Sequence, residues 1–173
     1  MKSLILGGTR SGKTRLAENM AKATHLPITY IATATALDSE MQARIGQHQL
    51  NRPADWQTIE EPIYLAQALD SNATDGRCII IDCLTLWLTN LICADNTLQL
   101  AHETNLFVES LAKLSSNIIV VSNEIGLGVT PTGLQTRQFC DAIGVLHQTL
   151  ANDCDRVILC IAGLPHLLKG DAP

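Results

Sequence analysis

The chain has 173 residues, of which 46% are hydrophobic and 17% are charged, and its formal net charge is −5. A chain of this length can bury a full core, and the composition is typical of a compact fold rather than a disordered segment. We therefore expect a single domain over residues 1–173. The acidic balance and the lack of a basic run make nucleic acid a poor candidate partner.

Six cysteines are spread along the chain without a C-x-x-C spacing, which argues against a zinc site. Several lie in apolar stretches, where cysteine packs as a small hydrophobe, so we expect no disulfide framework and a reducing compartment. The N-terminus has the pattern of a strand rather than of a signal peptide, and no apolar run reaches membrane-spanning length. These features predict a cytoplasmic protein without a membrane span.

The first predicted element is a short apolar strand over Ser3–Leu6, and a glycine-rich segment follows it directly. This segment fits the phosphate-binding P-loop pattern G-x-x-x-x-G-K-[ST] with Gly7, Gly8, Thr9, Arg10, Ser11, Gly12, Lys13 and Thr14. The glycines allow turns that point successive N–H groups at phosphate oxygens. Lys13 supplies positive charge for the β- and γ-phosphates, and the Thr14 hydroxyl can ligate Mg²⁺. The segment predicts that the protein binds a nucleoside triphosphate.

The rest of the chain alternates apolar runs with helical patterns. Further strands are predicted over Ile28–Ala32, Cys78–Asp82, Asn117–Ser122 and Arg156–Ala162, and helices over residues 13–24, 39–50, 62–71, 83–94, 99–115 and 133–153. The strand cores are continuous Ile, Val and Leu, which is typical of strands buried on both faces. We therefore predict an α/β P-loop NTPase fold with a mainly parallel sheet and helices on both faces. Ligands of such sheets bind beyond the carboxyl ends of the strands.

Small residues follow the second strand at Ala32, Thr33 and Ala34. They would let a ligand lie close to the backbone, although an ordinary connecting loop has the same composition. Ser39 and Gln42 form a capping-box pattern, which predicts that a helix begins at Ser39.

On that helix, His48 lies one turn after Arg44 and one turn before Arg52. A lone histidine on a helix is usually a surface or core residue. Two flanking arginines would, however, bind phosphate beside a nucleophilic imidazole. The residues alone leave both interpretations open.

An aspartate ends the third strand, where Asp82 follows three isoleucines. This Walker-B-like pattern favours a role in holding Mg²⁺, while an N-cap for the helix at 83–94 is the alternative.

The fourth strand leads into a loop with glycines and a proline, and Glu124 could face a ligand there. Trp87, on an apolar helix, could be either an interface anchor or a core residue.

Taken together, these motifs resemble the bifunctional adenosylcobinamide kinase / adenosylcobinamide-phosphate guanylyltransferase family of cobalamin biosynthesis. The matching segments run almost end to end: GGTRSGKT at 7–14, YIATA at 30–34, EMQARIGQHQLNRPADW at 40–56, DCLTLWLTNL at 82–91, SNEIGLGVTP at 122–131, RQFCDAIG at 137–144 and AGLPHLLK at 162–169. The P-loop is shared by many kinases and ATPases, whereas the histidine segment and the NEIGLG loop are far more specific.

The resemblance implies a RecA-like P-loop fold and one site that serves two reactions. In the first, ATP or GTP phosphorylates the aminopropanol arm of adenosylcobinamide. In the second, GTP transfers GMP to the resulting adenosylcobinamide phosphate through a guanylyl-His48 intermediate, with release of pyrophosphate. The implied contacts to GTP are residues 7–14, Ala32, Thr33, Ala34, Gln49, Leu50, Asn51, Arg52, Glu60 and Asp82, with Thr14 and Asp82 at Mg²⁺ and Lys13 catalytic beside His48. The resemblance also implies a homo-oligomer, with a trimer as the expected state.

Two positions depart from the family pattern. Cys140 stands where the family usually has arginine, and His147 stands where it usually has asparagine. Neither position is among the implied catalytic or metal-binding residues, so we expect the activity to be intact. The competing hypotheses are a P-loop small-molecule kinase in which His48 is merely structural, and a nucleotide-binding regulatory module that turns over no substrate.

Overall fold

The computed structural model describes residues 1–36, 38–50, 52–94 and 97–173, without the side chains of Arg44, His48, Leu50 and Thr97. Its strands are β1 (Lys2–Gly7), β2 (Ile28–Ala32), β3 (Gln57–Glu60), β4 (Cys78–Asp82), β5 (Asn117–Asn123), β6 (Arg156–Ile161) and β7 (Leu164–Lys169). Its helices are α1 (Lys13–Ala23), α2 (Ser39–Leu50), α3 (Leu65–Asn72), α4 (Leu84–Cys93), α5 (Thr97–Lys113) and α6 (Leu134–Asp153). None of the described helices is long and apolar enough to cross a bilayer.

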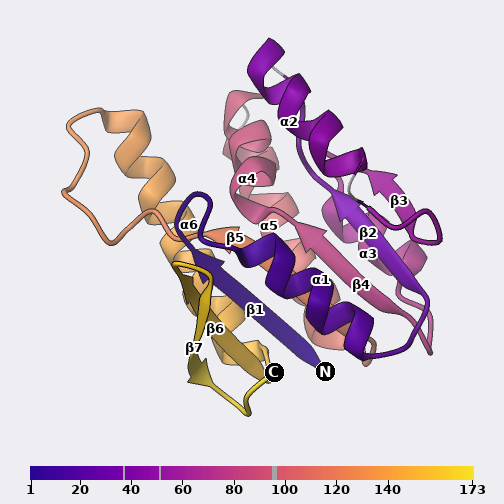
Figure 1. Ribbon diagram of the computed structural model, residues 1–173. Coiled ribbons are helices and arrows are strands. Elements are labelled where there is room, and N and C mark those ends of the chain that lie inside the picture. Colours follow the sequence, from indigo (N-terminus) through magenta and orange to yellow (C-terminus); the bar gives the residue numbers. More distant parts are fainter. Residues whose placement is uncertain (37, 51, 95–96) are drawn as a thin grey trace.

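The strands form one sheet in the order β3-β2-β4-β5-β1-β6-β7, as Figure 1 shows. All neighbours pair in parallel except β6 and β7, which form an antiparallel pair. The predicted mainly parallel sheet is therefore confirmed. The two strands at the ends of the order, β3 and β7, were not predicted, because their residues are largely exposed and lack the continuous apolar run of a buried strand.

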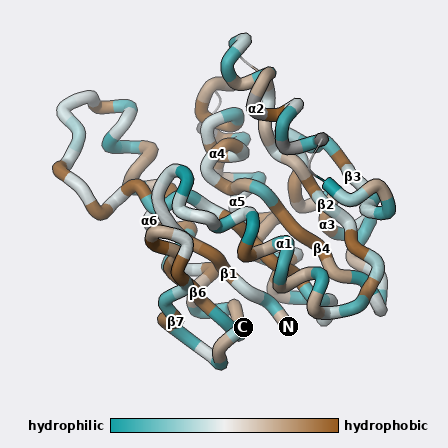
Figure 2. Tube along the Cα trace, viewed as in Figure 1, coloured by the Kyte–Doolittle hydropathy of each residue, from teal (hydrophilic) through white to brown (hydrophobic). Residues whose placement is uncertain are grey.

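Helices cover both faces of the sheet, as predicted (Figure 1). Helix α1 packs on one face through Ala17 and Ala21, and α3, α4, α5 and α6 pack on the other. Figure 2 shows hydrophobic residues along the central strand β4, between these two layers. Trp87 belongs to the core: it is fully buried, and its indole N–H donates to the Ile63 carbonyl over 2.8 Å. It is therefore no interface anchor.

Helix α2 begins at Ser39 as predicted but with a different capping residue, and helix α3 begins later than predicted. Helix α2 begins at Ser39, but its cap is Asp38, whose Oδ1 accepts the Met41 N–H over 2.7 Å. Helix α3 begins at Leu65 rather than at residue 62, because the Glu61 carboxylate accepts the N–H groups of the two residues before Leu65 and holds them in a turn.

Candidate active site

The P-loop connects the end of β1 to the start of α1, and two of its glycines are required by the backbone. Gly7 has a φ of 153°, and a Cβ at this position would lie 2.3 Å from the Cys160 carbonyl oxygen. Gly12, the N-cap of α1, has a φ of 97°. A side chain would be strained or excluded at both positions, so the loop can take this conformation only with glycine at Gly7 and Gly12.

Lys13 is the principal cation of the P-loop. The residue is 7% exposed, and its ammonium group donates to the Gly8 carbonyl over 2.6 Å, with Ser11 Oγ at 3.4 Å. Burial lowers the pKa of Lys13 below its usual value, and the nearby Cys83 and Asp82 partly oppose this effect. In this structure the ammonium group thus donates to the backbone of its own loop. From this position it can turn toward a bound phosphate.

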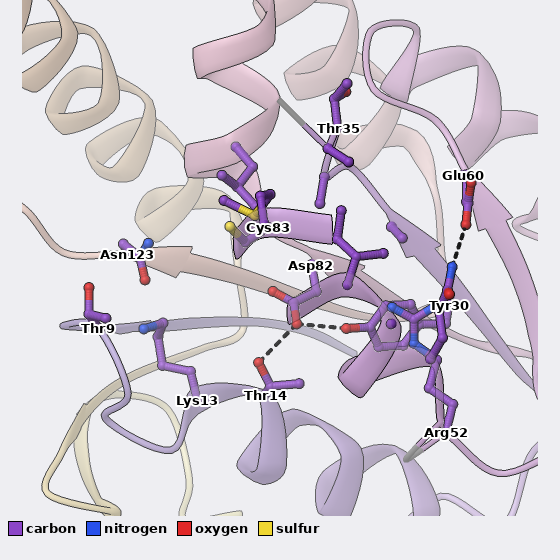
Figure 3. Close-up of a pocket in the computed structure, with 18 of the residues that line it drawn as sticks. Thr9, Lys13, Thr14, Tyr30, Thr35, Arg52, Glu60, Asp82, Cys83 and Asn123 are labelled. Atoms are coloured by element: carbon purple, nitrogen blue, oxygen red, sulfur yellow. Dashed lines mark hydrogen bonds between the residues drawn. The ribbon is translucent and has the colours of Figure 1, made fainter. Parts of the chain in front are cut away.

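A cavity of about 1060 Å³ opens beyond the carboxyl ends of the strands, as predicted. Figure 3 shows its two ends: Thr9, Lys13 and Asn123 lie on one side, and Arg52 and Glu60 lie on the other. Helix α2 contributes to the wall through residues on one of its faces, namely Met41, Gln42, Ile45, Gly46 and Gln49. The volume is at the upper end of the range of small-molecule binding pockets.

Asp82 lies between these two ends, at the end of β4. Its Oδ2 accepts hydrogen bonds from Thr14 Oγ1 over 2.9 Å and from the Tyr30 hydroxyl over 2.7 Å (Figure 3). The alternative N-cap role is excluded, because Cys83 occupies the N-cap position of α4. Burial, together with Asp82, raises the pKa of the Tyr30 hydroxyl, so this group remains a donor.

A hydroxyl and a carboxylate this close together suit a hard divalent cation. Mg²⁺ in nucleotide sites usually takes one or two protein oxygens and completes its shell with phosphates and water. Within the ranges that the structure describes, no cluster of three or more acidic, histidine or cysteine side chains offers an all-protein metal site. The donor set of Thr14 and Asp82 therefore fits an ion that arrives with a nucleotide.

At the other end of the cavity, the Arg52 side chain packs on a pair of stacked aromatic rings. The Arg52 guanidinium lies 3.9 Å above the centroid of the Tyr30 ring, which in turn stacks on Trp56 at 6.4 Å. Arg52 Nε and Nη1 are buried and have no hydrogen-bond partner among the described residues. Buried guanidinium donors without an acceptor suit an anionic ligand. Next to them, Gln49 Nε2 donates to Glu60 Oε1 over 2.8 Å.

His48 belongs to α2, and its side chain lies outside what the structure describes. Its position is three residues after Ile45 and seven after Met41, and both of these residues line the cavity. Helical periodicity places positions at these spacings on one helix face. Of its predicted neighbours, Asn51 lies outside the described residues, and for Leu50 only the backbone is described.

Most of the other predicted nucleotide contacts meet at the cavity. They are Thr9, Arg10, Ser11, Gly12, Lys13, Thr14, Ala32, Ala34, Gln49, Arg52, Glu60 and Asp82. Gly7 and Gly8 shape the P-loop without lining the cavity wall. Thr33 does not face the cavity either: it is fully buried, and its hydroxyl donates to the Cys83 carbonyl over 2.7 Å. Thr33 thus supports the loop after β2 instead of contacting a ligand.

Sequence reasoning assigned no role to Tyr30 or Asn123, which both line the cavity. Strand alternation could have indicated Tyr30, because it lies two residues before Ala32 and so points to the same face of the sheet. Asn123 ends β5 at the carboxyl edge, which is itself a signal. Glu124, in contrast, turns away: its carboxylate accepts the N–H of Gly126 in its own loop.

Fold and site together define a P-loop nucleotide-binding protein with a RecA-like α/β fold. The fold is shared with the RadB recombinase, which has a TM-score of 0.55 at 15% identity over 91% of this chain and 73% of that chain. A protein from Pyrococcus horikoshii OT3 has a TM-score of 0.57 at 9% identity over 99% of this chain and 87% of that chain. The family described as cobinamide kinase / cobinamide phosphate guanyltransferase matches residues 3–168, and the chain belongs to this family.

Curated relatives extend over the full chain. The bifunctional adenosylcobalamin biosynthesis protein CobP of Pseudomonas aeruginosa is 52% identical over 171 residues, which are 99% of both chains. The bifunctional adenosylcobalamin biosynthesis proteins CobU of Salmonella typhimurium and of Escherichia coli are each 32% identical over 182 residues, covering 98% of this chain and 100% of theirs. The resemblance seen in the sequence motifs is thereby confirmed.

Proposed function

We propose that this chain is a bifunctional transferase of cobalamin biosynthesis. It phosphorylates adenosylcobinamide with ATP or GTP, and then transfers GMP from GTP to the adenosylcobinamide phosphate, giving adenosylcobinamide-GDP and pyrophosphate. The observation that carries the proposal is one cavity with a P-loop at one end and α2 on its wall, in a chain that belongs to this family. The phosphate-binding loop and the helix that carries the proposed nucleophile His48 thus border the same cavity.

The P-loop end holds the triphosphate. The loop's N–H groups and the N-terminus of α1 face the phosphates, and Lys13 leaves the Gly8 carbonyl to bind their oxygens. Thr14 and Asp82 would hold Mg²⁺, which would neutralise charge on the phosphates when bound. In the kinase step, the substrate hydroxyl attacks the γ-phosphorus, the bond to the β-bridging oxygen breaks, and the hydroxyl proton is released.

In the second reaction, His48 is the nucleophile. A neutral imidazole nitrogen attacks the α-phosphorus of GTP, the bond to the bridging oxygen breaks, and pyrophosphate leaves. An oxygen of adenosylcobinamide phosphate then attacks the same phosphorus and releases the imidazole. Arg52, with two guanidinium nitrogens lacking acceptors within the described part of the chain, neutralises the α-phosphate. Gln49, Glu60 and the small residues Ala32 and Ala34 complete the nucleotide pocket.

Labelling with GTP that carries radioactive α-phosphate tests this proposal. We expect a label on the protein that survives alkali, is lost in acid and disappears in His48→Asn. His102→Asn, a matched change on the exposed surface of α5, should keep the label. Phosphorylation of adenosylcobinamide without a protein label would support a kinase with a structural His48. Nucleotide binding without acceptor-dependent consumption would support a regulatory module instead.

We also propose that the protein is a cytoplasmic homo-oligomer, with a trimer as the family expectation. All six residues of β7 are exposed, and among them Leu164, Leu167 and Leu168 form an apolar strand at the end of the sheet order. An exposed edge strand with apolar side chains can pair with another chain, which supports an oligomer. The six cysteines, all within the described ranges, are free thiols, which agrees with a reducing compartment.

A further inference from the structure

A chain of buried polar side chains lies behind the P-loop end of the cavity, and neither proposed reaction uses it. Ser122, at the end of β5, is fully buried, and its Oγ lies 2.7 Å from His147 Nε2 and 3.2 Å from Thr85 Oγ1. Thr85 Oγ1 accepts the backbone N–H of Asn123 over 2.7 Å. His147 Nδ1 lies 3.7 Å from Glu124 Oε2. Side chains from α4, β5 and α6 therefore meet in one network.

One direction of donation satisfies every member of this network. The Thr85 oxygen receives the Asn123 N–H, so its own proton is free for Ser122 Oγ, and the Ser122 proton then points to His147 Nε2. His147 Nδ1 then carries the ring proton and faces the Glu124 carboxylate. If a neutral ring donated from Nε2 instead, a lone pair of Nδ1 would face this carboxylate, which is repulsive. In this arrangement the imidazole is neutral, and burial lowers the pKa of His147, which favours the neutral form.

The network ends at the phosphate-binding edge of the cavity. Asn123 lines the cavity beside Thr9 and Lys13, as Figure 3 shows. The next residue is tied to the P-loop, because the Glu124 N–H donates to the Gly7 carbonyl over 3.0 Å. The position of Asn123 relative to Lys13 is therefore set from two sides, by its own N–H on Thr85 and by its neighbour on Gly7.

We propose that this network holds the Asn123 carboxamide against the transferred γ-phosphoryl group and the acceptor hydroxyl, and that His147 is a positioning residue for the kinase step. A carboxamide can donate to a phosphoryl oxygen and accept from a hydroxyl at the same time. Asn123 lies at the Lys13 end of the cavity, whereas Arg52 lies at the other end. The network should therefore matter less for transfer from the α-phosphate. This inference rests on the proposed function.

His147→Leu tests the inference, because it removes the ring nitrogens while an apolar side chain still fills the buried position. We expect the kcat of adenosylcobinamide-dependent phosphoryl transfer to fall by about 10- to 100-fold, as for a displaced contact at the reacting group. The KM for the nucleotide and the rate of protein labelling from α-labelled GTP should change by less than about threefold. His147→Gln, whose carboxamide can still meet Ser122, should restore most of the kinase kcat.

Leu150→Ala, a buried change on the same helix outside the network, is the control for a general loss of packing. A His147→Leu enzyme that loses both activities in the same proportion as this control, or keeps its kinase kcat, would overturn the inference. Thr85→Val, nearly isosteric, cuts the network at its other end and should produce the same split. Failure of both network variants to fold would assign the network to stability and also overturn it. A wild-type protein without phosphoryl transfer would overturn the proposed function itself.

Discussion

The Tyr30 hydroxyl donates to Asp82 Oδ2 over 2.7 Å, on the same carboxylate oxygen that accepts the Thr14 hydroxyl. The ring of Tyr30 also carries the Arg52 guanidinium on its face. One side chain thus supports both the proposed metal-binding carboxylate and the proposed α-phosphate ligand. Tyr30 is therefore a structural link between the P-loop end of the cavity and its opposite end.

Tyr30→Phe should lower the apparent affinity of the enzyme for Mg²⁺. Without the phenol, Asp82 loses one of the two hydrogen-bond donors found for its carboxylate among the described residues, and we expect the Mg²⁺ concentration for half-maximal activity to rise about 10-fold. The free energy of unfolding should fall by about 1 kcal/mol. A Mg²⁺ titration of both reactions measures the first effect, and urea unfolding measures the second. Tyr64→Phe, at a half-exposed tyrosine, is the control, and identical titrations of the two variants would refute the role of Tyr30.

Arg52→Lys should impair guanylylation although it keeps the charge. Lysine lacks the planar group that stacks on Tyr30 and presents two nitrogens to one phosphate. Losing one charge-assisted hydrogen bond of about 1.5–3 kcal/mol corresponds to a loss of roughly 10- to 150-fold in kcat/KM for GTP. Protein labelling at varied GTP concentration measures it. Arg77→Lys, just before β4 at the opposite edge of the sheet, should leave labelling nearly unchanged. Equal effects of the two changes would contradict the assignment.

Gly7→Ala should destabilise the protein far more than Gly8→Ala. A Cβ on Gly7 would meet the Cys160 carbonyl at 2.3 Å and Ser11 Oγ at 2.7 Å, whereas a Cβ on Gly8 would meet no heavy atom of the described chain within 4 Å. We expect a loss of about 1–3 kcal/mol or more for Gly7→Ala, and of less than about 0.5 kcal/mol for Gly8→Ala. Urea unfolding of the two variants gives the comparison. Similar losses would show that the P-loop backbone relaxes freely.

The sequence predicted the parallel sheet and the P-loop because both depend on local patterns. Continuous apolar runs mark the strands buried on both faces, and the spacing of Gly7, Gly12 and Lys13 marks the loop. The edge strands β3 and β7 carry no such run, so their pairing depends on the sheet that already exists beside them. Thr33 shows the same limit at the site, because only the folded chain reveals that its hydroxyl bonds to Cys83.

The buried network could not be predicted for a different reason. Ser122, Thr85 and His147 come from three elements, and nothing in their sequence spacing indicates that they meet. The departure at His147 from the family's asparagine was visible in the sequence, but its partners were not. Contacts between the end of one strand and two helices on the same face of the sheet can be identified only in the folded structure.

The buried imidazole should make stability depend on pH. Burial lowers the pKa of His147 below 6.5, and Glu124 only partly opposes this effect. Between the lowered folded value and the unfolded value, the unfolded chain binds a proton on this ring that the folded chain does not. The free energy of unfolding therefore rises with pH in this window and falls as the pH drops below about 6.5, by at most about 1.4 kcal/mol per pH unit for one proton.

Urea unfolding of the wild type and of His147→Gln, between about pH 8 and pH 5, isolates this contribution, because all other titrating groups are common to both proteins. We expect the wild type to lose stability more steeply than the variant as the pH falls below the unfolded value. Parallel curves would mean that His147 takes up its proton as easily in the folded state as in the unfolded state. That result would contradict the assignment of Nε2 as the acceptor of the Ser122 proton, and with it the proposed direction of donation in the network.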